Sequence, residues 1–198
     1  MLRVRLVAAL ATVFASTAGI AMPSRPRWNP VERIPVWIEK TSRRAHDSEM
    51  VRRAFETWSA ASGGTLAFRE VEVFPSNGIR VRFGAREGFF GEAIPYADRD
   101  TGQIVRADVL LSAEVDGDDL HRQAVTYLTA LHEVGHALGL EHTTKFTAAM
   151  YQFRRPADPD QYFLRYRSRT PSPDTVGIQV GDGLSTADVK ALRRLYGP

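Results

Sequence analysis

Apolar and polar residues alternate along four short stretches of the chain, which we therefore expect to be β-strands. A period of two places successive side chains on opposite faces of a sheet. The predicted strands are residues 34–39, 66–73, 79–83 and 104–112. Turn-forming residues separate them, including a Pro-Ser-Asn-Gly sequence at 75–78. Together these segments predict the greater part of one twisted sheet.

Residues 91–96 form a fifth candidate strand with a different character. Pro95 has no N–H to donate to a neighbouring strand, so this segment suits the edge of the sheet better than its centre. An exposed edge can bind an extended peptide as an added strand. We therefore expect Gly91 and Ala93 to contact an extended peptide that binds at this edge. The alternative is that residues 91–96 form a surface loop.

Apolar residues recur at helical spacing in three other segments. Residues 48–61 place Val51, Ala54, Phe55 and Trp58 on one side, and a Gly-Gly pair at 63–64 follows. A second apolar series runs from Ala124 to Leu138. The last predicted helix covers residues 184–197, and Ser185 with Asp188 three positions later is typical of a capping box. We expect an α+β fold in which helices back the sheet.

The second helix carries the residues that suggest a chemical function. His132 and His136 are four apart, so a helix directs both imidazoles from the same face, with Glu133 beside them. Gly139 can adopt a positive φ and end the helix, which lets His142 return to the same point. Three neutral imidazoles leave one tetrahedral position on Zn²⁺ open, as in catalytic zinc sites. We therefore predict that His132, His136 and His142 bind one zinc ion.

Glu133 is the candidate general base for this zinc site. Zinc lowers the pKa of a bound water molecule to about 7, and a nearby carboxylate can take its proton and pass it to a leaving amine. An HExxH pattern alone also occurs by chance in solvated helices. The additional Gly139 and His142, with apolar spacing behind them, favour the metal site.

The extended motif HExxHxxGxxH, followed by Met150, resembles the metzincin clan of zinc peptidases. Three details are similar to its matrixin branch. Thr143 follows the third histidine, where matrixins usually have serine, and Met150 with Tyr151 resembles the matrixin methionine turn. Gln152 stands where astacins carry a metal-binding tyrosine, so no fifth protein ligand is expected.

The resemblance implies a zincin-like fold: a mostly parallel five-stranded sheet with an antiparallel edge, an active-site helix, a backing helix and a C-terminal helix. It also implies a zinc-dependent endopeptidase that hydrolyses peptide bonds and acts on peptide or protein substrates, with Tyr151 near the substrate. The alternative is a secreted metal-binding adhesin or inhibitor without turnover. The presence of Glu133 argues against that alternative, because a site that only binds zinc needs no base.

Residues 151–183 are longer than the corresponding connection in matrixins, and we expect an irregular inserted loop. The loop interleaves aromatic residues with arginines and contains four prolines. In matrixins this connection walls the pocket for the side chain after the cleaved bond, so the insert is expected to reshape that pocket. A lid, a partner-binding surface and a stacking platform for single-stranded nucleic acid are the alternatives.

The N-terminus has the composition of an export signal. Residues 1–21 combine Arg3 and Arg5 with an apolar core and a stretch of small residues. The apolar core is too short to span a membrane stably. We expect a signal peptide at 1–21, a short arm at 22–30 and a peptidase domain at 31–198. The protein would then be secreted or periplasmic, and the absence of cysteine is consistent with bacterial export.

Composition sets limits on further partners. Removal of residues 1–21 would lower the formal net charge from +3 to +1, so no nucleic-acid partner is expected, and we expect a monomer. His46 and His121 cannot rebuild the second, structural zinc site of vertebrate matrixins. Acidic turns could hold Ca²⁺, although such turns are usually just solvated; the candidates are Asp98, Asp100, Asp116, Asp118 and Asp119.

Overall fold

The computed structural model describes residues 25–40, 45–84, 90–112, 114–179 and 182–197. The predicted signal peptide at 1–21 lies outside the described residues. Among the helices of the described part, none combines the length and the apolar character needed to cross a bilayer.

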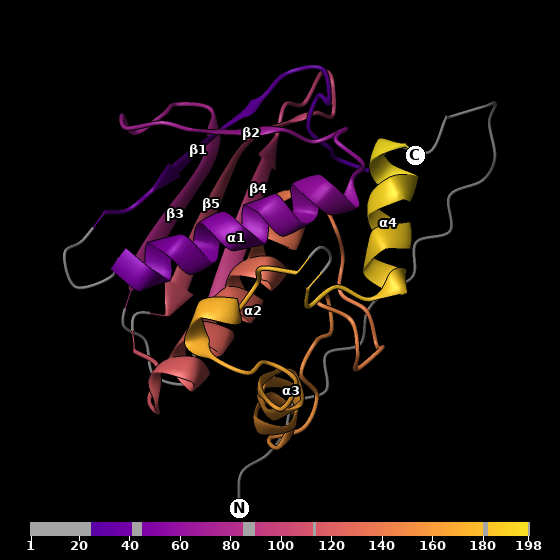
Figure 1. Cartoon of the computed structure of the whole chain (residues 1–198). Coiled ribbons are helices and arrows are strands. Elements are labelled where there is room, and N and C mark those ends of the chain that lie inside the picture. The colour runs from indigo at the N-terminus through magenta and orange to yellow at the C-terminus, as the bar shows by residue number, and fades with distance from the viewer. Residues whose placement is uncertain (1–24, 41–44, 85–89, 113, 180–181, 198) are drawn as a thin grey trace, which may run out of the picture.

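Five strands form one sheet in the order β2-β1-β3-β5-β4 (Figure 1). The strands β1 (Ile34–Ile38), β2 (Phe68–Glu70), β3 (Gly78–Gly84) and β5 (Ile104–Ser112) pair in parallel. The edge strand β4 (Gly91–Ala97) is antiparallel to β5, with Ala93 opposite Val109. The predicted mostly parallel sheet with an antiparallel edge is confirmed, and residues 91–96 belong to a strand and not to a loop.

The second strand is shorter than predicted. The expected segment 66–73 forms a strand only at Phe68–Glu70. Leu66 is buried, and its backbone N–H donates to the Ser62 hydroxyl at 3.0 Å, so it belongs to the turn after the first helix. Ala67 and Val71 still share backbone hydrogen bonds with β1, at 2.9 and 2.8 Å, so the prediction was too long only at the two ends of the segment.

Two long helices pack against each other and against the sheet. They are α1 (Ala45–Ala61), which begins three residues before the predicted start at residue 48, and α2 (Asp119–Ala137). Trp58 of α1 is fully buried and donates from its indole to the Leu131 carbonyl at 2.8 Å. The side chains between the helices and the sheet form one core, which includes Val36, Val81, Val109, Leu131 and Val134.

The segment 151–183 is not the irregular loop that we predicted. It contains the helix α3 (Asp158–Arg167) and a 3₁₀ turn η1 (Pro173–Thr175). Pro159 lies in the first turn of α3, where a missing N–H costs no helical hydrogen bond. Asp158 anchors the start of α3, because its carboxylate accepts from the backbone N–H of Arg154 at 2.9 Å and of Arg155 at 3.1 Å. Pro159 and Pro173 thus lie in the first turns of α3 and η1.

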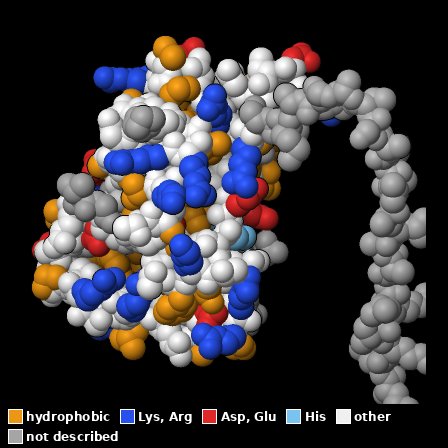
Figure 2. Space-filling view, turned by 90° about the vertical axis from the view of Figure 1, so that its right-hand side faces the viewer, with side chains coloured by type: hydrophobic (Ala, Val, Ile, Leu, Met, Phe, Trp, Pro, Cys, Tyr) orange, Lys and Arg blue, Asp and Glu red, His pale blue; other side chains and the backbone are white. Residues whose placement is uncertain are grey.

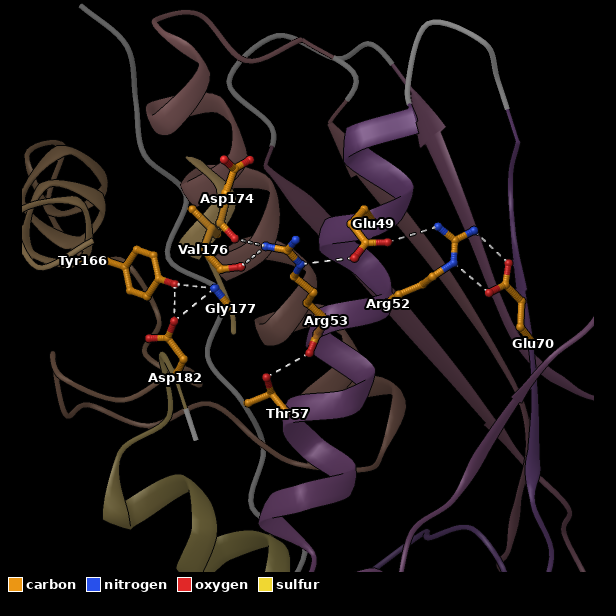
Figure 3. A network of polar contacts seen from close by, with 10 residues as sticks. All are labelled: Glu49, Arg52, Arg53, Thr57, Glu70, Tyr166, Asp174, Val176, Gly177 and Asp182. Atoms are coloured by element: carbon orange, nitrogen blue, oxygen red, sulfur yellow. Dashed lines mark hydrogen bonds and ion pairs between the residues drawn. The ribbon is translucent and has the colours of Figure 1, made fainter. Parts of the chain in front are cut away.

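Polar contacts attach this segment to the rest of the domain (Figure 3). The Arg53 guanidinium of α1 donates to the carbonyls of Asp174 and Val176 at 3.1 and 2.5 Å. The Tyr166 hydroxyl of α3 donates to the Asp182 carboxylate at 2.6 Å. These bonds hold residues 174–177 and Asp182 beside α1 and α3, so the described part of the segment belongs to the fold.

The C-terminal helix α4 (Thr186–Tyr196) begins with the predicted capping box. The Ser185 hydroxyl accepts from the Asp188 backbone N–H at 3.3 Å, and the Asp188 carboxylate accepts from the Ser185 backbone N–H at 2.7 Å. The arm before β1 reaches the same region. Trp28 is buried, and its indole donates to the Ala137 carbonyl at the end of α2, at 2.8 Å.

Candidate metal centre

The end of α2 brings the three predicted histidines together. Gly139 has φ +88°, as expected. The Gly139 N–H donates to the His136 carbonyl at 2.8 Å and the Leu140 N–H to the Gly135 carbonyl at 2.9 Å, which is the bonding pattern of a Schellman motif. This turn reverses the chain and places His142 opposite the helix.

The three Nε2 atoms converge on one point. The His132–His136 distance is 3.1 Å, the His132–His142 distance 3.2 Å and the His136–His142 distance 3.0 Å. A tetrahedral zinc ion with Zn–N bonds of about 2.0–2.1 Å separates its nitrogen ligands by about 3.3 Å. Among the residues that the structure describes, this is the one group of three or more metal-binding side chains that could share an ion. The spacing therefore fits zinc.

Hydrogen bonds on the other ring nitrogens set the tautomers. His132 Nδ1 lies 2.7 Å from the Ala149 carbonyl, and His136 Nδ1 lies 2.8 Å from the Leu140 carbonyl. A carbonyl can only accept, so each Nδ1 carries the proton and each Nε2 presents its lone pair. Lone pairs at these distances repel one another unless a cation lies between them.

Burial keeps these imidazoles neutral. Desolvation, followed by the charge of His136, lowers the pKa of His132 to about 4. Desolvation also lowers the pKa values of His136 and His142. Neutral imidazole is the form that binds metal, so the three side chains are ready as ligands at neutral pH.

Glu133 lies beside this group and is 5% exposed. Its burial, and secondarily the charge of Glu92, raise its pKa to about 8, whereas a bound divalent cation would favour the carboxylate. Gly91 of the edge strand comes very close, because a Cβ atom at that position would lie 2.6 Å from Glu133 Cγ. Glycine at position 91 thus allows the edge strand to pass directly over the candidate base.

Met150 lies beneath the histidines, in the turn that the sequence predicted. It is buried, and a Cβ atom on Gly135 would collide with its sulfur. The Thr143 N–H donates to the Met150 carbonyl at 2.8 Å, which ties this turn to the residue that follows His142. The backbone of the turn also orients His132 through the Ala149 carbonyl.

Asp188 supports this turn, a role that we did not predict from the sequence. Its carboxylate accepts from the backbone N–H groups of Ala149 at 2.9 Å and Met150 at 3.2 Å, in addition to its capping bonds in α4. A carboxylate can accept more hydrogen bonds than a capping box uses. The unused acceptor positions of Asp188 were the feature of the sequence that could have indicated a second partner. The partner, however, lies 38 or 39 residues away in the chain.

Two cavities flank the histidines. One, of about 250 Å³, has mainly aromatic walls formed by Phe90, Phe153, Tyr162 and Phe163, and Gly91 and Tyr151 also line it. Ala93 lines the second cavity, of about 500 Å³, together with His136 and Leu140. The residues predicted to bind substrate therefore lie on both sides of the metal group. The Tyr151 hydroxyl is already engaged, since it donates to Asp158 at 2.7 Å.

The aromatic residues of 151–183 are not an exposed stacking surface. Tyr162, Phe163 and Tyr166 are 4%, 4% and 3% exposed and pack into the core.

The acidic turns that were candidates for calcium have partners within the protein. Asp98 accepts from the Thr101 N–H at 2.9 Å, and Asp118 accepts from the His121 N–H at 2.8 Å at the start of α2. These contacts explain the two carboxylates without a calcium ion.

The sequence of the chain is similar to that of one known protein family. Residues 33–180 match the family profile described as Matrixin. The chain is 34% identical to matrix metalloproteinase-15 of Homo sapiens, over 68% of this chain and 21% of that protein. It is 34% identical to the hatching enzyme of Paracentrotus lividus over 52% of this chain and 18% of that protein.

A plant relative covers more of the chain. Metalloendoproteinase 1-MMP of Arabidopsis thaliana is 29% identical over 88% of this chain and 45% of that protein. The chain thus spans from about a fifth to less than half of the length of these relatives. The family profile covers most of its residues, and on this ground the chain belongs to the matrixin family of metallopeptidases.

Proposed function

We propose that the protein is a secreted zinc-dependent endopeptidase in which His132, His136 and His142 hold the metal and Glu133 is the general base. The observation that carries the proposal is the convergence of three Nε2 lone pairs, 3.0–3.2 Å apart, next to a buried carboxylate. Family membership supports the peptidase chemistry. Secretion rests on the composition of residues 1–21.

Each side chain has a defined part in hydrolysis. Zinc held by the three imidazoles would supply a Lewis acid and lower the pKa of the attacking water. Glu133 takes a proton from that water and later gives it to the leaving amine. His132 and His136 keep their orientation through the Ala149 and Leu140 carbonyls, so the reacting groups need little reorganisation.

The edge strand and the aromatic cavity would hold the substrate. The backbone of β4 has one side unpaired in the described sheet, so an extended peptide can add there as a further strand. Gly91 then places that peptide over Glu133. The aromatic cavity of about 250 Å³ beside Glu133 would receive an apolar side chain next to the cleaved bond.

The decisive experiment compares the wild-type chain with two glutamate variants on a peptide library. Glu133→Ala should retain zinc and its melting temperature but lose turnover by at least about 10²-fold, the usual scale for a general base. Glu141→Gln is the control, because Glu141 is next to His142 but exposed and ion-paired with Arg25. Turnover in Glu133→Ala at the wild-type rate would exclude Glu133 as the base.

Metal content separates the peptidase from the alternative of a binding protein. A chelator should stop cleavage, and added zinc should restore it. His142→Ala should lose most of the single zinc ion, because two imidazoles remain where three are needed. A zinc-loaded wild-type protein that cleaves no peptide of the library would favour the metal-binding adhesin or inhibitor.

A further inference from the structure

A cavity between α3 and the start of α4 is lined by two arginines from the end of α3 and the residues that follow it. Its volume is about 590 Å³, and it is distinct from both cavities at the metal group. Arg165 and Arg169 line it together with the polar side chains Thr147, Thr170, Gln179 and Ser185. We infer that this cavity is a binding site for an oxyanion, held by the guanidinium groups of Arg165 and Arg169.

Arg165 is held in place by contacts that leave most of its donors free. Its guanidinium carbon lies 5.3 Å from the centre of the Tyr162 ring and 5.7 Å from that of Phe146. These cation–π contacts hold the Arg165 side chain beside the two rings. One terminal nitrogen makes a long bond of 3.5 Å to the Thr147 carbonyl. The Nε atom is enclosed and has no hydrogen-bond partner.

The positive charge of this pair is not balanced by an ion pair. Neither Arg165 nor Arg169 forms a salt bridge with a carboxylate in the described part of the chain, whereas Arg155 and Arg167, from the same segment, pair with Asp158 and Asp118. Arg169 instead donates from Nε to the Arg165 carbonyl at 3.2 Å, which holds the two arginines near each other. Burial and the charge of Arg169 lower the pKa of Arg165, as expected for an uncompensated cation.

The end of α3 and the Asp182 carboxylate also affect the electrostatics of the cavity. The C-terminus of α3 favours positive charge, which is consistent with basic residues such as Arg165 in its last turn. Asp182 also lines the cavity, but its carboxylate accepts from the Tyr166 hydroxyl at 2.6 Å and the Gly177 N–H at 3.0 Å. These neutral donors leave the negative charge of Asp182 in place, and the two arginines keep the lining positive on balance.

The surface around the cavity favours an anion. A shallow groove over α4 shares Leu184 and Ser185 with the cavity and is lined by Lys190, Arg193 and Arg194. Figure 2 shows Lys and Arg side chains spread over the face that includes α4, with few Asp and Glu side chains among them. Such a surface attracts an anion before it enters the cavity.

The shape of the donors indicates the ligand class. The planar fork of arginine binds two oxygens of a carboxylate, phosphate or sulfate group at once. Thr147 adds a hydroxyl at the edge of the same space, whereas the hydroxyls of Thr170 and Ser185 already donate to the Tyr166 carbonyl and to Asp188. The ligand is either a free oxyanion or a carboxylate carried by an acidic peptide, and the two sources share this chemistry.

Calorimetric titration of the full chain tests the site. Sodium sulfate and a hexaglutamate peptide are titrated separately, at constant ionic strength, into the wild-type protein and into Arg165→Met and Arg169→Gln. Arg169 is exposed, so its replacement leaves the fold intact even if Arg165→Met perturbs it. Arg33→Gln is the matched control, because it removes an exposed arginine elsewhere.

Saturable binding should weaken by about tenfold in both site variants and remain unchanged in the control, the scale of a lost charge-assisted hydrogen bond. Binding of sulfate would identify a site for free oxyanions. Binding of hexaglutamate alone would identify a site for acidic peptides. The inference is wrong if neither probe saturates, or if Arg169→Gln and Arg33→Gln bind the probes as the wild type does.

Discussion

At the scale of single residues, the carboxylate of Asp188 connects the C-terminal helix to the turn under the histidines. It is 2% exposed and accepts hydrogen bonds from the backbone N–H groups of Ala149, Met150 and Ser185 and from the Ser185 hydroxyl. The Ala149 carbonyl in turn contacts His132 Nδ1 at 2.7 Å. Asp188 is thus two hydrogen bonds away from the candidate metal ligand His132.

We predict that Asp188→Asn weakens both the fold and metal binding. An amide replaces one acceptor oxygen with a donor, so N–H groups of the turn or of the cap lose their partner, at a cost of about 1–3 kcal/mol for each group left unsatisfied. Zinc affinity should fall by about 10–100-fold, because the support of a metal ligand is disturbed. Urea unfolding and competition with a chelator measure the two effects.

The control for this variant is Asp160→Asn, which changes an exposed carboxylate in the first turn of α3. It should leave zinc affinity unchanged. If Asp188→Asn binds zinc as tightly as the wild type, the turn does not depend on α4 for its geometry.

Residues with local partners could be predicted, and residues with distant partners could not. The positive φ of Gly139 and the return of His142 to the helix depend on one helix end and one reversal of the chain. Both features could be predicted from the local sequence. Asp188 also follows as a cap, because Ser185 is three residues away. Its contact with Met150, and the approach of Gly91 to Glu133, depend on how separate elements pack.

At the scale of elements, α3 shows how a buried carboxylate can nucleate a helix among prolines. Asp158 is fully enclosed and accepts from Tyr151 and from the backbone of Arg154 and Arg155. The helix was not predicted, because the acceptor role of Asp158 depends on a turn that local composition does not reveal. One face of α3 then supplies Tyr162 and Phe163 to the aromatic cavity.

We predict that Asp158→Asn destabilises the protein at neutral pH and has a smaller effect in acid. The backbone N–H of Arg154, followed by the Tyr151 hydroxyl, holds the pKa of Asp158 well below its usual range. Its contribution is therefore complete above the ordinary pKa of aspartate, about 3.9, and is lost as the pH falls through the lower folded-state value. An asparagine cannot make this transition.

Urea unfolding between pH 2.5 and pH 7 measures the difference between the wild type and Asp158→Asn. The difference should be largest near neutrality and should shrink below about pH 4. A difference that is the same at both ends of this range would mean that the ionised form of Asp158 has no special part in holding α3.

At the scale of the whole molecule, the sheet and its backing helices could be predicted from the sequence, because residues that share a core recur at regular apolar spacing. Ala107, Val109 and Leu111 alternate along β5 and are all buried. The position of the arm before β1 was less accessible. A single Trp28 among prolines and polar residues gives no periodic signal, yet its side chain is only 6% exposed.

The arm connects three parts of the fold around the metal group. The Trp28 indole donates to the Ala137 carbonyl at 2.8 Å, and the Trp28 backbone N–H donates to the Tyr196 hydroxyl at 3.1 Å. The Tyr196 hydroxyl donates in turn to the Leu138 carbonyl at 2.8 Å. These bonds join the arm and α4 to the end of α2, directly before the turn at Gly139 that positions His142.

We therefore predict that Trp28→Ala destabilises the full chain by about 3–5 kcal/mol, the usual cost of truncating a buried tryptophan, and weakens zinc retention. Zinc retention should fall because the end of α2 loses the support that fixes the approach to His142. Arg25→Ala is the control, since the Arg25–Glu141 ion pair is 66% and 68% exposed and such pairs contribute about 0–1 kcal/mol. Chemical unfolding and dialysis against a chelator give the two measurements. If Trp28→Ala and Arg25→Ala have the same stability and the same zinc retention, the arm is not needed by the domain that begins at residue 31. If Trp28→Ala shows the predicted losses, the arm is part of the domain that builds the metal centre.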